Sequence, residues 1–284
     1  MKKVFVFPGQ GSQSVGMGKD LWDRFPRQVE QANDILGYSL PKLCLEDPDG
    51  LLTRTDFLQP ALYVVCVLTY LDRIQSGDSM PQAVAGHSLG EYAALFVAGA
   101  FDFATGLRLV TKRGALMAKA QGGGMAAIIG LDTQRVSAIL AQPEFADVEI
   151  ANDNSPNQLV ISGALEAVNA ASQVLQQNGA RHCVPLKVSA AFHSRSMLSA
   201  AEAFRRFIDP VEFQPLQIPV VANATARPYG PGETADLLAK QISSPVRWTD
   251  SIKYLIAEGA TDFVEVGPGN VLTTLIRQIK GKAA

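Results

Sequence analysis

Apolar positions along the chain recur at two spacings, which predict strands alternating with helices. Short apolar runs at residues 3–7 and 82–86 have the length of buried strands, and glycine-containing turns follow them. Residues 60–74 and 103–120 carry apolar side chains at helical spacing, and Pro60 suits the first turn of the earlier helix. Short buried strands alternating with helices are typical of a parallel α/β sheet, so this is the fold class expected for most of the chain.

The pattern changes after the glycine-rich break QGGGM at residues 121–125. From there the chain reads strand, helix, two strands separated by the turn NSPN, helix and strand. That βαββαβ order is typical of ferredoxin-like domains. We therefore expect an inserted small domain at residues 125–188 and a large domain built from residues 1–124 and 189–284.

The composition is that of a globular protein without bulk attraction for nucleic acid or anionic membranes. Of the 284 residues, 47% are hydrophobic and 18% are charged, and the formal net charge is −2. The first apolar run ends at Pro8 and is too short for a signal segment. No apolar run is expected to reach the roughly 20 residues of a membrane span. A cytoplasmic, soluble monomer is therefore expected.

The cysteines do not suggest a metal site. Cys44, Cys66 and Cys183 are widely spaced and form no C-x-x-C pattern, which supports neither zinc binding nor a disulfide framework. Buried thiols of this kind fit a reducing compartment. The candidate chemistry must therefore come from other residues.

The segment GHSLG at residues 86–90 has the G-x-S-x-G spacing of a nucleophilic serine on a sharp turn between a strand and a helix. The strand expected before Ser88 and the helix expected at 89–98 provide that context. The free N–H groups and positive dipole end of such a helix favour a developing oxyanion, and the backbone N–H of Leu89 is the natural first donor. The structural alternative is a serine that only caps an ordinary helix.

A nucleophilic serine needs a base, and the chain offers three histidines. His87 is adjacent to Ser88, and neighbours on a tight turn point apart, so we expect His87 to pack or bond locally. His182 lies on the expected last strand of the small domain, where a structural role is expected. His193, in SAAFHSRSM, lies where the chain leaves that domain, and its small neighbours permit close approach to another element. His193 is therefore the predicted base.

The group that orients this histidine is left open. Most acidic residues between Ser88 and His193 belong to the small domain, and other acidic residues follow the histidine. These candidates are Asp132, Glu144, Asp147, Asp153, Asp209, Asp250 and Glu265. An amide or a backbone carbonyl could orient the imidazole equally well.

Six ordered segments together resemble the malonyl-CoA:acyl-carrier-protein transacylases over nearly the whole chain. They are FPGQGSQSVGMG, GHSLGEYAAL, RLVTKRGALM, GGGMAAIIGL, AFHS and QISSPVRWTDSI. The segments VSAAFHSRSM and QISSPVRWTDSIKYL are similar to the free-standing acyltransferases that serve polyketide synthases without a built-in acyltransferase domain. The resemblance implies a large domain like the α/β-hydrolase core with a ferredoxin-like insert.

The resemblance also implies roles for residues near the serine. Ser88 would be the nucleophile and His193 the base, and the backbone N–H groups of Gln10 and Leu89 would hold the oxyanion. Glycines around Gln10 would let the backbone approach the ester carbonyl, whereas the residues alone indicate a plain turn. Arg113 would bind the free carboxylate of malonate through two parallel hydrogen bonds, although its spacing alone also suits a surface helix.

Three further positions carry implied supporting roles. Gln241, in KQISSPVRW, matches the position whose carbonyl and amide hold the histidine and the arginine in place of an acid. Asn154 is implied to give a second carbonyl contact to His193. Phe192 matches the version of the motif that narrows the pocket beside the acyl α-carbon, so malonyl is expected over methylmalonyl.

The implied reaction moves a malonyl group from malonyl-CoA to the phosphopantetheine thiol of an acyl carrier protein, through a malonyl-serine intermediate and without a metal or redox cofactor. The expected product supplies a polyketide synthase, or otherwise fatty-acid synthesis. One alternative is an acyl hydrolase of the same fold that clears carrier proteins, which has little use for Arg113. The other is a non-catalytic docking partner of a synthase, against which an intact Ser88 and His193 argue.

Overall fold

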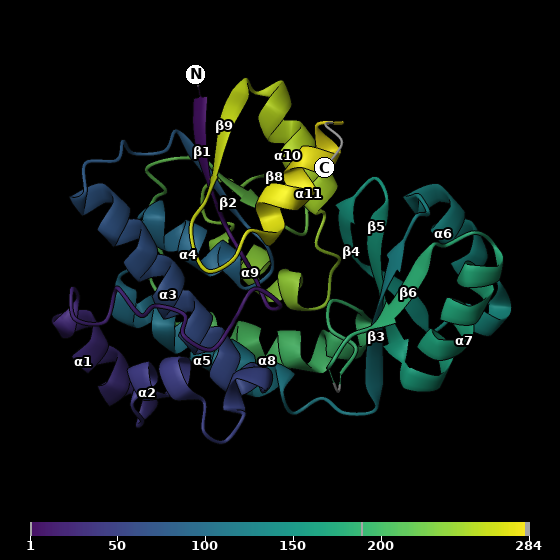
Figure 1. Cartoon of the computed structure of the whole chain (residues 1–284), viewed down its shortest axis with the longest axis horizontal. Helices are drawn as coiled ribbons and strands as arrows, with labels where there is room; N and C mark the ends of the chain where they lie inside the picture. Colours follow the sequence, from purple (N-terminus) through teal and green to yellow (C-terminus); the bar gives the residue numbers. More distant parts are fainter. Residues whose placement is uncertain (1, 189, 282–284) are drawn as a thin grey trace.

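A five-stranded sheet forms the core of the larger part of the molecule (Figure 1). The computed structural model describes residues 2–188 and 190–281. The strands are β1 (Lys2–Phe7), β2 (Ala83–Gly86), β7 (Val220–Ala222), β8 (Arg227–Pro228) and β9 (Ala260–Glu265). They lie in the order β8-β7-β2-β1-β9, and all neighbours are parallel except β7 and β8. The expected parallel α/β core is therefore confirmed.

Helices cover both faces of this sheet. They are α1 (Pro26–Leu36), α2 (Leu40–Glu46), α3 (Thr55–Gln75), α4 (Gly90–Val97), α5 (Phe103–Met117), α8 (Leu198–Ile208), α9 (Thr234–Ile242), α10 (Trp248–Ala257) and α11 (Val271–Ile279), with short 3-10 turns at Leu51–Thr53 and Arg195–Met197. Successive side chains of a strand point to opposite faces. Along β1, Phe5 and Phe7 therefore pack with α3, α4 and α5, whereas Val4 and Val6 pack with α10 and α11.

The central helix α3 differs from expectation in two respects. It begins at Thr55, so Pro60 lies inside the helix and omits one hydrogen bond to the carbonyl four residues earlier. Its 21 residues are also long and apolar enough to cross a membrane, contrary to the expectation that no such run exists. However, 67% of its most apolar stretch is buried inside the protein. The apolar composition of α3 is therefore explained by its position as a buried core helix.

A second, antiparallel sheet with two helices forms the small domain, on the right in Figure 1. Its elements are β3 (Gly123–Ile129), α6 (Thr133–Leu140), β4 (Val148–Ser155), β5 (Gln158–Ala164), α7 (Leu165–Gln177) and β6 (His182–Pro185), with a 3-10 turn at Pro143–Phe145. The order β4-β5-β3-β6, antiparallel throughout, is that of a ferredoxin-like sheet. β3 starts just before residue 125, and we propose that 125–188, with those preceding glycines, fold as the inserted domain.

One face of the small sheet is turned toward the larger domain. Along β3, Ala126 and Ile128 pack with α6 and α7, whereas Met125 and Ala127 line a pocket. The other walls of that pocket come from the larger domain. Alternate residues of β3 therefore pack in the core of the small domain and line the pocket.

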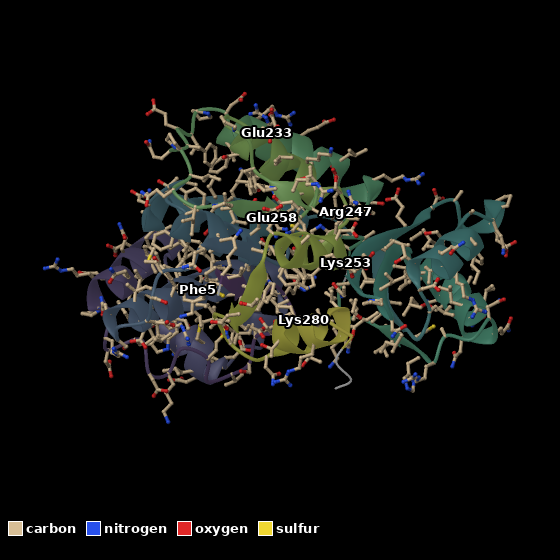
Figure 2. All side chains as sticks on the ribbon, turned by 90° about the horizontal axis from the view of Figure 1, so that it is seen from above. Phe5, Glu233, Arg247, Lys253, Glu258 and Lys280 are labelled. Carbon is tan, nitrogen blue, oxygen red and sulfur yellow. The ribbon has the colours of Figure 1, made fainter. Side chains whose placement is uncertain are left out.

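Backbone hydrogen bonds join the small domain to the segment before α10. The N–H of Val246 donates to the carbonyl of Ala151 at 2.8 Å, and the N–H of Asp153 donates to the carbonyl of Val246 at 2.9 Å. In Figure 2, seen from above, the teal small domain lies beside the yellow helices α10 and α11. These contacts fix the two walls of the pocket relative to each other.

Candidate active site

Ser88 occupies a strained turn between β2 and α4 that only glycine neighbours permit. Its φ is +50°, in the left-handed region that few non-glycine residues adopt. A Cβ on Gly86 would lie 1.9 Å from the carbonyl carbon of Gly90, and a Cβ on Gly90 would lie 2.0 Å from the carbonyl oxygen of Phe7. The G-x-S-x-G spacing therefore has a steric cause here.

An asparagine at the end of β7 holds this turn. The Oδ1 of Asn223 accepts the backbone N–H of Ser88 at 2.6 Å, and its Nδ2 donates to the carbonyl of Gly86 at 2.6 Å. The parallel pairing of β2 with β7 brings Asn223 beside the turn. These two hydrogen bonds help to offset the strain at Ser88.

His193 lies within hydrogen-bond distance of Ser88 and is almost fully buried. Its Nε2 is 2.8 Å from Ser88 Oγ, while its Nδ1 lies 2.9 Å from the carbonyl of Gln241 and 3.2 Å from that of Ser244. Carbonyl oxygens only accept hydrogen bonds, so Nδ1 carries the proton and Nε2 is free to accept the Ser88 hydroxyl hydrogen. Backbone carbonyls therefore orient the imidazole, which settles the question that the sequence left open.

The surroundings of His193 keep its ring neutral. Burial and the nearby charge of Arg113 lower its pKa to about 3, against the opposing effect of the carbonyl hydrogen bonds. A neutral imidazole is the form that accepts a proton from a serine hydroxyl.

Arg113 is fully buried on α5, which excludes the surface-helix alternative. Its Nη2 donates to Ser88 Oγ at 3.1 Å and to Gln241 Oε1 at 2.9 Å, both uncharged acceptors. Within the described part of the chain its Nε has no hydrogen-bond partner. A buried guanidinium with unused donors can receive an anionic group beside the serine.

Gln241 connects the serine, the histidine and the arginine. Its backbone carbonyl accepts from His193, its Oε1 accepts from Arg113, and its Nε2 donates to the carbonyl of Ser88 at 2.9 Å. The side chain is fully buried. This is the arrangement that the resemblance implied for Gln241.

The expected contact between Asn154 and His193 is wrong. The Oδ1 of Asn154 lies 2.7 Å from Nε2 of His87 instead, and the second carbonyl facing His193 belongs to Ser244. The ring of His87 packs edge-on against Trp248. Its hydrogen bond is not the local one that the sequence suggested, because Asn154 lies on β4 of the small domain.

A pocket of about 220 Å³ opens beside the serine. Both domains line it, and the sequence-predicted residues on its wall are Gln10, Ser88, Leu89, Arg113, Asn154, Phe192 and His193. Gln241 lies behind this wall. Gln10 belongs to the loop after β1, which is adjacent to β2 in the sheet, so two loops meet beside the serine. Phe192 lines the same pocket, and the roles predicted for these residues remain proposals.

Several residues of the site were not predicted. Glu91, Asn223, Tyr229 and Ser244 belong to the hydrogen-bond network. Gln59 lines the pocket, and its Oε1 has no hydrogen-bond partner among residues 2–188 and 190–281. Glu91 had a signal, because an acid in the apolar helix GEYAALFV is out of place unless it is paired. Burial raises the pKa of Glu91 to about 7, although its hydrogen bonds and Arg113 oppose the shift.

The chain matches the family model of the acyl transferase domain over residues 4–282. It is 51% identical to the polyketide biosynthesis malonyl CoA-acyl carrier protein transacylase BaeC of Bacillus velezensis, over 98% of this chain and 97% of that protein. It is 52% identical to the polyketide biosynthesis protein ThaF of Burkholderia thailandensis, over 97% of this chain. The chain spans only 24% of the length of ThaF.

Solved structures with the same fold cover the whole chain. A malonyl CoA-acyl carrier protein transacylase from Burkholderia pseudomallei superposes with a TM-score of 0.96 at 45% identity, covering 100% of this chain and 99% of the other. A malonyl-transacylase in complex with its type II polyketide synthase acyl-carrier protein, PlMCAT:AntF, superposes with a TM-score of 0.94 at 37% identity, covering 99% and 94%.

Proposed function

The chain belongs to the acyl transferase domain family, and from this premise we propose that it moves malonyl groups from malonyl-CoA to an acyl carrier protein. It is an [acyl-carrier-protein] S-malonyltransferase. The observation that carries this proposal is the buried guanidinium of Arg113, whose Nη2 is 3.1 Å from the oxygen of Ser88. A cation fixed beside the nucleophile selects an acyl group that has its own negative charge.

The proposed reaction has two halves that share one base. His193 takes the hydroxyl proton of Ser88, and the serine oxygen attacks the thioester carbonyl of malonyl-CoA. The tetrahedral intermediate collapses, the bond to sulfur breaks, and CoA leaves as the thiol after receiving the proton from His193. The phosphopantetheine thiol of the carrier protein then gives its proton to His193 and attacks the malonyl-serine ester. Ser88 recovers its proton, and the malonyl group leaves on the carrier.

Backbone N–H groups of Gln10 and Leu89 are the proposed donors to the oxyanion. Both residues line the pocket, and Leu89 lies at the N-terminal end of α4, where free N–H groups and the helix dipole favour negative charge. Donors held in place before the reaction stabilise the charge that develops in the transition state.

Arg113 is the proposed carboxylate site, and Phe192 the proposed limit on the acyl α-carbon. A malonyl carboxylate would accept hydrogen bonds from Arg113, whereas an acetyl group has no carboxylate to offer this buried guanidinium. Phe192 lines the pocket as a bulky side chain, which favours malonyl over methylmalonyl by a modest factor.

The pathway and location are proposed from relatives and from the cysteines. BaeC and ThaF carry polyketide biosynthesis in their names, and we propose that this chain likewise supplies a polyketide synthase. The complex of the related malonyl-transacylase with an acyl-carrier protein supports the same class of partner here. The free thiols of Cys44 and Cys66 are buried, which fits a reducing cytoplasm. The chain needs no metal or redox cofactor for this reaction.

A carrier-loading assay tests this function. The protein is mixed with malonyl-CoA and a carrier protein bearing phosphopantetheine, and malonyl-carrier and free malonate are measured over time. We expect loading to outpace malonate release, with acetyl-CoA disfavoured by about a hundredfold. Faster release of malonate than loading would make the protein a hydrolase. A Ser88→Ala variant that retains full activity of the synthase pathway would leave the protein only a docking role.

A further inference from the structure

Glu91 is buried just after the nucleophile, yet it has no part in the proposed proton transfers. It lies in the first turn of α4, and its exposed fraction is 0%. Among residues 2–188 and 190–281 it is the only acidic residue that is buried. Burying a carboxylate is costly unless hydrogen bonds compensate, so its partners indicate its role.

The two oxygens of the Glu91 carboxylate have separate partners. Oε1 accepts the hydroxyl hydrogen of Tyr229. Oε2 accepts the backbone N–H of Asn223 at 3.0 Å and the side-chain Nε2–H of Gln241 at 2.8 Å. Glu91 is thus joined through Oε2 to the asparagine that holds the serine turn and to the glutamine that holds the arginine.

Glu91 decides which way the amide of Gln241 faces. The Nε2 of Gln241 donates to Glu91 Oε2 and to the carbonyl of Ser88, so both of its hydrogens meet acceptors. Oε1 of Gln241 must then face Nη2 of Arg113, 2.9 Å away. The reversed amide would place hydrogens against a guanidinium, which cannot accept them.

Resting on the proposed function, we propose that Glu91 is a positioning residue, which orients Arg113 toward the substrate carboxylate by fixing the amide of Gln241. The same glutamine holds Nδ1 of His193 through its backbone carbonyl. Glu91 itself contacts no reacting atom. It acts on malonyl selectivity through Gln241.

The variant Glu91→Leu tests this role with a side chain of similar size. It removes both carboxylate oxygens, so the donors of Asn223, Gln241 and Tyr229 lose their acceptor. We expect kcat/KM for serine malonylation to fall by about tenfold to a hundredfold, with a rise in KM, because Arg113 loses its orientation. Acetylation of the serine does not use Arg113 and should fall far less, so the malonyl-to-acetyl ratio drops.

Tyr229→Phe is the matched control. It removes the hydrogen bond to the other carboxylate oxygen of Glu91 and leaves the contact with Gln241 in place. We expect this variant to keep the wild-type malonyl-to-acetyl ratio even where its thermal stability falls. An equal loss of ratio in both variants would mean that Glu91 only supports the fold, and would overturn the proposal.

A double-mutant cycle with Gln241→Ala tests whether Glu91 acts through the glutamine. The substitution Glu91→Leu should change the malonyl-to-acetyl ratio much less in the Gln241→Ala background than in the wild type. If the two substitutions changed this ratio independently, so that their factors multiplied in the double variant, the proposal would be contradicted. If Glu91→Leu does not fold, Glu91→Asp takes its place, since the shorter carboxylate keeps the charge but withdraws from Gln241.

The wild-type protein separates failure of this inference from failure of the function. A wild type that forms no malonyl-serine contradicts the proposed function itself. A wild type that forms it, together with a Glu91→Leu variant of unchanged ratio, contradicts only the role of Glu91.

Discussion

At the residue scale, the two central side chains sit on strained backbone. The φ angles are +50° at Ser88 and +57° at His193, and such conformations cost about 1–3 kcal/mol each. Ser88 donates its backbone N–H to Asn223, and His193 donates from Nδ1 to two carbonyls, and these hydrogen bonds hold the pair at 2.8 Å. These hydrogen bonds therefore stabilise the two strained backbone conformations that bring the serine oxygen and the imidazole together.

Replacing Arg113 should change substrate selectivity more than overall chemistry. We expect Arg113→Ala to lower kcat/KM for malonyl-CoA by about a hundredfold to a thousandfold, because the substrate carboxylate loses a charged, two-fold hydrogen-bond partner. The kcat/KM for acetyl-CoA should fall much less. The exposed Arg108 lies on the same helix, and Arg108→Ala is the control that should leave both rates unchanged. Equal losses for the two substrates in Arg113→Ala would contradict the carboxylate role.

His193 should make the protein less stable in acid. In the unfolded chain it binds a proton below its ordinary pKa of 6.5, whereas in the folded protein it stays neutral down to about 3. The unfolded state therefore binds more protons in this window, and the free energy of unfolding falls as the pH falls. From about pH 6.5 to about pH 5 the histidine accounts for a loss of about 2 kcal/mol.

Urea unfolding of the wild type and His193→Gln at both ends of this pH range measures that loss. The variant lacks the titrating group, so it should lose less stability on acidification than the wild type. An identical loss in the two proteins would show that His193 is not held neutral in the fold.

Single residues differ in how far the sequence reveals them. Ser88 lies in a spacing with a steric cause, and His193 follows by elimination among three histidines. The carbonyls of Gln241 and Ser244 that orient the imidazole have no such signal, because every residue has a backbone carbonyl. The role implied for Asn154 is wrong, because its side-chain amide is hydrogen-bonded to His87 and not to His193.

At the element scale, the close approach of α4 to β1 determines the shape of the site. A Cβ at Gly90 would meet the backbone of Phe7 at 2.0 Å, and a backbone atom cannot move aside as a side-chain end can. We expect Gly90→Ala to destabilise the protein by about 4 kcal/mol or more, or to prevent folding. Thermal unfolding and soluble yield measure this.

Gly37 offers the comparison for that prediction. It has a φ of +77° but open space around it, so Gly37→Ala should cost only about 1–2 kcal/mol from backbone strain. Similar losses in Gly37→Ala and Gly90→Ala would contradict the steric argument.

The elements themselves are well predicted where the apolar pattern is regular. The βαββαβ order of the small domain follows from alternating short runs and from the turn NSPN. The start of α3 is not predicted correctly. Pro60 resembles a proline of the first helical turn, but the helix begins at Thr55. The apolar contacts of a buried helix outweigh the one hydrogen bond that a proline omits.

At the scale of the whole molecule, the pocket exists only because two domains meet. Ser88, His193 and Arg113 come from the larger domain, while Met125, Ala127 and other residues of the small domain form the opposite wall. The sequence predicts both domains but not their contact, which depends on pairing between β4 and the segment before α10.

Intact-mass analysis of the protein after mixing with malonyl-CoA, with peptide mapping of the adduct, tests the central claim most directly. The account predicts one malonyl group per chain, carried on Ser88, absent from Ser88→Ala, and lost when a phosphopantetheine-bearing carrier protein is added and becomes malonylated. An adduct on another residue, or an unmodified Ser88 in a protein that still loads the carrier, would contradict it.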